Sequence, residues 1–314
     1  MKIRFTILVT MLAFSLVAVQ CTDDNEGTDG TGRLKVKVTD APSDDAQVKG
    51  TFITISEVKI NGKTVNGFTA QTIEISAYQD GKAKLIFEDD LEAKTYSNVS
   101  LVLNYEKDDS GNEPGCYVLT DDNAKHQLEA SATGEVSLDE SFELTAGGTT
   151  DLVIDFDLRK AIVRDDEGTT GEYKFVTEAE LKNSIRLVDE NECGDIRGKV
   201  NGYSSVDGTI IVFAYKKGTF NLLTETQAQG SSGVMFSNAV TSAKVKADGS
   251  YQLSFLEKGD YELRVISCEE DEHGYVHFKA MVDAVSAISG LIINNLSVEA
   301  KNQLNLDIEI SAGQ

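Results

Sequence analysis

The chain has 314 residues and a formal net charge of −23, because 52 aspartates and glutamates outnumber 29 lysines and arginines. Such an acidic surface repels nucleic acid and anionic membrane surfaces, which excludes a nucleic-acid-binding role and favours cationic partners or divalent ions. Hydrophobic residues make up 40% of the chain, enough for a sizeable core, and the length fits about two domains.

The N-terminus has the pattern of an export signal. Lys2 and Arg4 precede an apolar run from Phe5 to Val19, and Cys21 follows it. This run is typical of a secretory signal peptide and is too short to span a bilayer comfortably. A cysteine at this place resembles the signal of bacterial lipoproteins, which implies cleavage before Cys21 and a diacylglycerol on its thiol. We therefore expect residues 1–20 to be a lipoprotein signal peptide, and the lipid on Cys21 to hold the protein to a membrane.

Residues 21–32 are expected to form a flexible acidic tether, because they combine a short acidic run with glycine and threonine. An acidic run just after the lipidated cysteine resembles the surface-export signal of lipoproteins of the Bacteroidota type. The resemblance implies an outer-membrane lipoprotein exposed on the cell surface. The alternative is a lipoprotein that faces the periplasm.

The stretch 141–157 predicts a strand, a turn at Gly147-Gly148 and a second strand. Apolar side chains alternate with polar ones in both arms (Phe142, Leu144 and Ala146, then Leu152, Ile154 and Phe156). Side chains of a strand point to opposite faces in turn, so one face is expected to lie in a core and the other in water. Asp155 and Asp157 fall on the face expected to be in water.

The first domain is expected over residues 33–190 as a β-sandwich of many short strands separated by Asn-Gly and Asp-Gly turns. The apolar positions change face at Ser56-Glu57, which predicts a β-bulge there or a strand that changes sheets. The one expected helix is short and lies near residues 177–183. Thr177 and Glu180 form a capping box at its start.

Several motifs of this part resemble a domain of unknown function that is common in lipoproteins. They are Thr39-Asp40-Ala41-Pro42, the segment with Leu91, Tyr96 and Leu101, Gly147 to Val153, Asp155 to Asp157, and Ile185-Arg186-Leu187. The resemblance covers residues 33 to 188. It implies a β-sandwich with a surface or periplasmic role and supplies no catalytic residues.

The second domain is expected over residues 193–314. The apolar run Ile210 to Tyr215 predicts a central strand covered on both faces. Strands with strict alternation follow around the turn at Gly259 and at the C-terminal end. This pattern resembles the carboxypeptidase regulatory-like domains, relatives of transthyretin, over residues 194 to 311. We therefore predict an all-β protein of two sandwiches in tandem, immunoglobulin-like or transthyretin-like.

Both domains carry the same local device. Leu91 precedes Tyr96 by five residues, and Leu256 precedes Tyr261 by five, with an apolar strand after each tyrosine. A buried tyrosine whose hydroxyl bonds to nearby backbone is a corner device of sandwiches. The alternative is an ordinary core aromatic residue at each place.

Four cysteines are present, and Cys21 is assigned to the lipid. Export permits disulfides, and Cys193 and Cys268 are the pair that we consider, since they open the second domain and end one of its strands. Cys116 is expected to be a thiol at a strand edge.

Two groups of residues are considered for metal ions. His273 and His277 follow an acidic run, but residues four apart on a strand lie about 13 Å from each other, so a loop would have to fold back. Asp108 and Asp109 offer oxygens for calcium without the spacing of a known calcium loop. The alternative for both is a solvated polar loop.

The chain lacks the usual motifs of a serine nucleophile, a zinc protease or a phosphate-binding loop. We therefore predict a non-enzymatic, lipid-anchored envelope protein that binds or adheres to an unknown protein or glycan partner, with no cofactor. A structural spacer or accessory subunit of an envelope assembly is the alternative. A metal-dependent hydrolase using His273, His277 or the acidic loops is a remote one.

Overall fold

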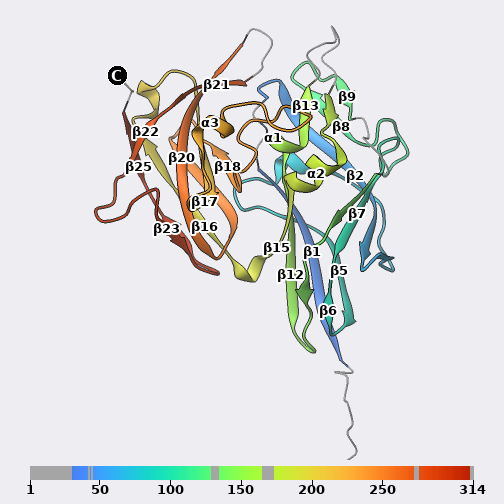
Figure 1. Ribbon diagram of the computed structural model, residues 1–314. Helices are drawn as coiled ribbons and strands as arrows, with labels where there is room; N and C mark the ends of the chain where they lie inside the picture. The colour runs from blue at the N-terminus through green and yellow to red at the C-terminus, as the bar shows by residue number, and fades with distance from the viewer. Residues whose placement is uncertain are drawn as a thin grey trace, which may run out of the picture.

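The computed structural model describes residues 30–41, 43, 45–128, 134–164, 173–271 and 276–311. Residues 31–189 build one group of β-sheets and residues 193–311 build another, and we call these two groups the N-terminal and the C-terminal module. In Figure 1 the modules lie side by side, and the start of β1 (Thr31–Ala41) points away from the C-terminal module.

The N-terminal module contains a sheet of four strands in the order β15-β12-β1-β5. Its other members are β5 (Lys84–Glu92), β12 (Thr149–Asp157) and β15 (Ile185–Asp189). Strand β1 is parallel to β12 and antiparallel to β5, and β12 is antiparallel to β15.

The second sheet of this module is antiparallel and has the order β10-β7-β2-β8-β9, with β3 and β4 also paired to β2. Its strands are β2 (Val48–Ile60), β3 (Lys63–Thr64), β4 (Gln71–Glu74), β7 (Val99–Leu103), β8 (Tyr117–Thr120), β9 (Lys125–Gln127) and β10 (Glu135–Leu138). Two small two-stranded sheets complete the module: β6 (Thr95–Tyr96) with β11 (Phe142–Glu143), and β13 (Ile162–Arg164) with β14 (Tyr173–Phe175).

The C-terminal module has two five-stranded sheets. One contains β16 (Cys193–Asn201), β19 (Ser250–Glu257), β22 (Asp283–Ser286), β24 (Gln303–Asn305) and β25 (Ile308–Ser311). The other contains β17 (Thr209–Lys216), β18 (Thr241–Lys244), β20 (Gly259–Glu270), β21 (Val276–Met281) and β23 (Leu296–Val298). The all-β fold expected from the sequence is confirmed.

Helices are short. The helix predicted near 177–183 is α2 (Glu178–Ser184), and its capping box between Thr177 and Glu180 is present. The sequence did not predict the two single-turn helices α1 (Leu158–Ala161) and α3 (Leu222–Glu225), nor the 3₁₀ turns at Ile75–Ala77, Glu190–Glu192 and Tyr203–Ser205. Among the described residues, none of the helices is long and apolar enough to span a membrane.

Two local predictions about strands are confirmed. The pairing of β2 with β7 shifts register between Ile55 and Glu57, so Ile53 and Ile55 are buried before the bulge and Val58 and Ile60 after it. Strand β17 is covered on both faces, because its alternate side chains enter two separate apolar clusters.

The predicted hairpin around Gly147-Gly148 is wrong in its pairing. The chain does turn at Gly147, which has a positive φ of 70°. However, β11 pairs with β6, while β12 lies between β1 and β15 and has no free edge for β11. Period-two alternation identified the strands but could not identify their neighbours.

Both predicted tyrosine corners are present. Tyr96 donates its hydroxyl hydrogen to the carbonyl oxygen of Glu92 at 2.8 Å, and Tyr261 donates to that of Glu257 at 2.7 Å. Each bond closes a turn four residues long beneath a buried ring. The same hydrogen bond therefore holds the chain in place at a turn beside a strand in both modules.

We expect Tyr261→Phe to lower the free energy of unfolding by about 0.5–1.5 kcal/mol, the usual contribution of one hydrogen bond. The ring stays buried, so only the bond to Glu257 and the 2.7 Å contact with the Lys216 ammonium are lost. Urea unfolding of Tyr261→Phe and the matched Tyr96→Phe measures the effect in each module. A change below 0.2 kcal/mol in both would show that the corner bonds contribute nothing net.

Candidate functional site

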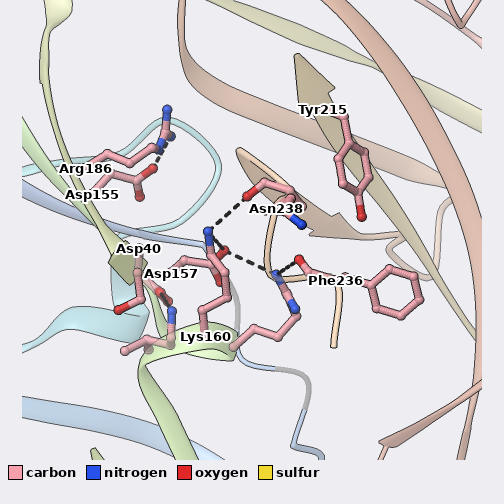
Figure 2. A network of polar contacts seen from close by, with 12 residues as sticks. Asp40, Asp155, Asp157, Lys160, Arg186, Tyr215, Phe236 and Asn238 are labelled. Atoms are coloured by element: carbon pink, nitrogen blue, oxygen red, sulfur yellow. Dashed lines mark hydrogen bonds and ion pairs between the residues drawn. The ribbon is translucent and has the colours of Figure 1, made fainter. Parts of the chain in front are cut away.

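A group of buried charged side chains lies where the modules meet (Figure 2). Three carboxylates and three cations belong to it, and all come from the N-terminal module: Asp40 on β1, Asp155 and Asp157 on β12, Arg159 and Lys160 on α1, and Arg186 on β15. Asp40, Asp155 and Asp157 are each at most 5% exposed. We call this group the junction network.

The carboxylates and cations of the junction network neutralise one another. Arg186 forms an ion pair with Asp155. Lys160 lies 3.1 Å from the Asp157 carboxylate, and Arg159 lies 3.5 Å from the same oxygen. Because the side chains of Asp157, Arg159 and Lys160 are 8% exposed or less, removing any partner leaves a charge in a poorly solvated place.

The cations also reach main-chain oxygens of the C-terminal module. Arg159 donates to the carbonyls of Met235 at 2.6 Å and Phe236 at 3.0 Å. Lys160 donates to Ala239 at 2.9 Å, and Arg186 donates to Phe255 at 3.2 Å. These three cations therefore bind the backbone of the C-terminal module rather than particular side chains.

The expectation that Asp155 and Asp157 face water is wrong. The face of β12 that carries them is covered by the C-terminal module, which places Phe255 beside Val153 in a small apolar cluster with Val188. A strand in a single sandwich keeps one face in solvent, whereas this strand lies between two modules.

Burial changes the acidity of the network. Burial raises the pKa of Asp40 well above its usual value, and the nearby Asp155 and Asp157 carboxylates raise it further, while a hydrogen bond from Gln79 lowers it. Burial also raises the pKa of Asp155, against the opposing effect of Arg186. The pKa of Lys160 is lowered by burial although Asp157 opposes the change.

A cavity of about 140 Å³ adjoins the network between the modules. Asp40, Asp155 and Gln79 line it from one side, and Ser242 and Ser254 line it from the other. Asp40 accepts a hydrogen bond from Gln79 at 2.9 Å and a long one of 3.4 Å from the Leu158 amide. Its carboxylate is the one acid of the network for which the described residues provide no ion pair.

A second polar contact between the modules involves the capping box of α2. Glu180 accepts hydrogen bonds from the Ser232 amide at 3.0 Å and from its hydroxyl at 2.6 Å, and from the Thr177 hydroxyl at 2.6 Å. Burial alone would raise the pKa of Glu180, but these hydrogen bonds outweigh it and lower the pKa to about 2. The residue predicted as a helix cap therefore also holds the loop after α3.

The residues considered for metal ions are not assembled into a site in the part of the chain that the structure describes. His277 is exposed on β21 and lies 2.9 Å from Asp271, whereas His273 lies outside the described residues. Asp108 accepts hydrogen bonds from the amides of Ser110 and Asn112 in its own loop.

Asp109 accepts a hydrogen bond from the Thr72 amide and so ties its loop to β4. Across the described part of the chain, no three His, Cys, Asp or Glu side chains are grouped to hold a metal ion.

The disulfide considered between Cys193 and Cys268 is not formed. Cys193 lies opposite Glu257, next to the start of β20, and Cys268 lies nine residues beyond Gly259 on that strand. At about 3.3 Å per residue the two are roughly 30 Å apart. A disulfide needs Cα atoms within about 7 Å. Cys21, the predicted lipidation site, lies outside the described residues.

The sequence contained one unused signal for the junction network. Arg159 and Lys160 closely follow the end of β12, and two adjacent cations at the end of a strand that carries Asp155 and Asp157 are a signal that the sequence analysis did not use. Arg186, named only as part of a motif, was not connected to Asp155, which is 31 residues away in the chain.

One comparison with known protein families concerns the N-terminal module. Residues 31–177 match the family described as "Domain of unknown function (DUF4382)". This match confirms the resemblance to a domain of unknown function in the N-terminal module. No curated protein matches the chain.

Several solved structures overlap weakly with the chain. The Bacillus anthracis TIE protein is 10% identical, with 90% of this chain and 34% of that one covered and a TM-score of 0.20. BcpA, the major pilin subunit of Bacillus cereus, is 10% identical, with 90% and 71% covered and a TM-score of 0.22. A putative adhesin from Bacteroides ovatus is 11% identical, with 98% and 99% covered and a TM-score of 0.20. The chain thus spans about a third of the TIE protein.

Proposed function

We propose that this protein is a non-enzymatic, lipid-anchored protein of the cell envelope, displayed on the outer surface, where it binds or adheres to a protein or glycan partner. The observation that carries the proposal is Cys21 placed directly after a basic, apolar leader. The start of β1 points away from the C-terminal module, which suits a body held at its N-terminal end (Figure 1).

The junction supports a second candidate function, a structural spacer in an envelope assembly. Hydrogen bonds from Arg159, Lys160 and Arg186 to backbone carbonyls of the C-terminal module couple the modules, and such coupling favours a fixed relative orientation. The interpretation of the C-terminal module as carboxypeptidase regulatory-like belongs to this candidate, because such domains serve as rigid spacers.

We expect Cys21→Ala to abolish incorporation of a labelled fatty acid into the protein, since the acylated thiol is removed. The matched control is Thr22→Ala, which changes the next residue and should label like the natural chain. Labelling is measured in growing cells and followed by electrophoresis. Persistent labelling of Cys21→Ala would contradict the anchor.

Protease treatment of intact cells then separates surface display from the periplasmic alternative, because only a displayed body is cleaved. Glycan and protein arrays, read together with cross-linking in intact cells, separate the two functions. Binding to a specific array member favours adhesion, whereas one stoichiometric envelope partner without array binding favours the spacer.

A further inference from the structure

The chain contains three Asn-Gly pairs, and two of them belong to the same tripeptide. Val65-Asn66-Gly67 and Val200-Asn201-Gly202 are identical in sequence, and Ile60-Asn61-Gly62 differs from them only in its first residue. Glycine is conformationally permissive and has no side chain to shield its amide nitrogen, so that nitrogen can attack the asparagine side chain before it. Because the local chemistry is the same at all three pairs, a difference between them in the folded protein must come from the structure.

The reaction closes a succinimide ring. The glycine nitrogen attacks Cγ of the asparagine and loses its proton, the bond from Cγ to the side-chain nitrogen breaks, and ammonia leaves with that proton. Water then adds to one of the two ring carbonyls and breaks its bond to the ring nitrogen. Opening at the side-chain carbonyl gives aspartate, and opening at the main-chain carbonyl gives isoaspartate. Either product carries a negative charge that asparagine lacks.

The side chain of Asn61 is held in place. Asn61 and Gly62 form the turn between β2 and β3, and Oδ1 of Asn61 accepts hydrogen bonds from the Ser97 amide at 2.7 Å and the Ser97 hydroxyl at 3.1 Å. The main-chain amide of Asn61 donates to the Asn98 carbonyl at 3.2 Å. Attack requires the two reacting atoms to be brought together in the right orientation, so these hydrogen bonds must break first.

Asn201 is restrained by the neighbouring strand. It is the last residue of β16 and pairs with Glu309 on β25, and its side-chain amide donates to the Glu309 carboxylate at 2.8 Å. Gly202 is confined as well, because a Cβ atom placed there would lie 2.7 Å from the Ile310 carbonyl oxygen. The main chain therefore has little room to rotate at this pair.

The Asn66-Gly67 pair has neither restraint. It lies in a turn between β3 and β4, Asn66 is exposed, and among the described residues its carboxamide has no hydrogen-bond partner. A Cβ atom placed at Gly67 would meet no atom within 4 Å. We propose that Asn66 is a site of spontaneous deamidation in the folded protein, and that the structure protects Asn61 and Asn201 from the same reaction. This modification goes beyond the proposed function and does not depend on it.

The test follows the full chain, purified and incubated at mildly alkaline pH, both in buffer and in urea. Peptide mass spectrometry measures aspartate and isoaspartate at each pair over time, and cleavage after Lys63 separates Asn61 from Asn66. The readout for each pair is its rate in the folded protein divided by its rate in urea, where the structural restraints are absent. We expect this ratio to be at least about tenfold larger for Asn66 than for Asn61 or Asn201, because hydrogen bonds that must break first slow the reaction by that order.

The variant Asn66→Gln gives an independent check, since its longer side chain would have to close a larger ring. Isoelectric focusing of the aged natural chain should show a first acidic species that is missing from Asn66→Gln. The matched control is Asn201→Gln, the same change in the same tripeptide, which should still form that species.

A larger ratio at Asn66, together with loss of the acidic species in Asn66→Gln alone, supports the proposal. Equal ratios at the three pairs, a larger ratio at Asn61 or Asn201, or an acidic species that persists in Asn66→Gln overturns it. None of these results changes the acyl-labelling or array outcomes, so a failure here is distinct from a failure of the proposed function.

Discussion

Replacing Arg186 by methionine is expected to lower the free energy of unfolding by about 3–5 kcal/mol, the usual cost of removing one partner of a buried ion pair. Asp155 is 4% exposed and has Arg186 as its ion-pair partner. Methionine fills a similar volume but leaves that carboxylate uncompensated. It also removes the donor to the Phe255 carbonyl of the C-terminal module.

The control is Arg33→Met, which removes a pair with Asp90 in which both side chains are 50% exposed. Solvent screens such a pair, so stability should hardly change. The double variant Asp155→Asn, Arg186→Met should recover much of the loss, because no lone charge remains. Urea unfolding measures all three. A loss in Arg186→Met no larger than that in Arg33→Met would contradict the burial of this pair.

The sequence predicted the strands well because burial on one face leaves a period of two. The bulge after Ile55 and the double coverage of β17 both follow from which side chains are apolar, and the structure confirms both. The corner bonds of Tyr96 and Tyr261 were also predictable, since they connect residues only four apart.

The junction could not be predicted in this way. Alternation states which face of β12 is apolar but not what covers the other face, so Asp155 and Asp157 were expected in water. They are buried beneath the C-terminal module, whose Phe255 and Ala239 carbonyls accept hydrogen bonds from their ion-pair partners Arg186 and Lys160 and lie far along the chain. The disulfide could not be judged from the sequence for the same reason. Cys193 lies on β16 beside the start of β20, whereas Cys268 lies near the far end of β20.

What covers β17 was equally hidden. A continuous apolar run indicates that both faces are covered, but it does not indicate by what. Here one face is filled by the opposite sheet, and the other packs against Phe236 of the loop that follows β17, so that Ile211 and Phe213 are buried. The path of that loop has no periodic pattern in the sequence.

Asp40→Asn is expected to raise the free energy of unfolding at neutral and alkaline pH by about 1–3 kcal/mol, the range for burying an uncompensated polar group. Asp40 is 5% exposed, and Asp155 and Asp157 lie near it, so its ionised form is disfavoured. Asparagine has nearly the same shape and still accepts the hydrogen bond from Gln79. Only the long 3.4 Å contact with the Leu158 amide is weakened.

The pH dependence gives this prediction its sign. The pKa of Asp40 is raised in the folded protein, so the folded state keeps a proton that the unfolded state releases near pH 4. Its contribution to stability is complete below that pH and is lost as the pH rises through the folded pKa. Urea unfolding between pH 4 and pH 9 should show a larger loss for the natural chain than for Asp40→Asn. The control is Asp90→Asn, at an exposed and ion-paired carboxylate. It should give no such gain, because the hydrogen bond that Asp90 accepts from Arg33 lowers the pKa of Asp90.

Parallel curves for the natural chain and Asp40→Asn would contradict the prediction. They would mean that Asp40 is ionised in the folded protein as readily as an exposed aspartate, and that the junction network solvates its carboxylate better than its burial implies.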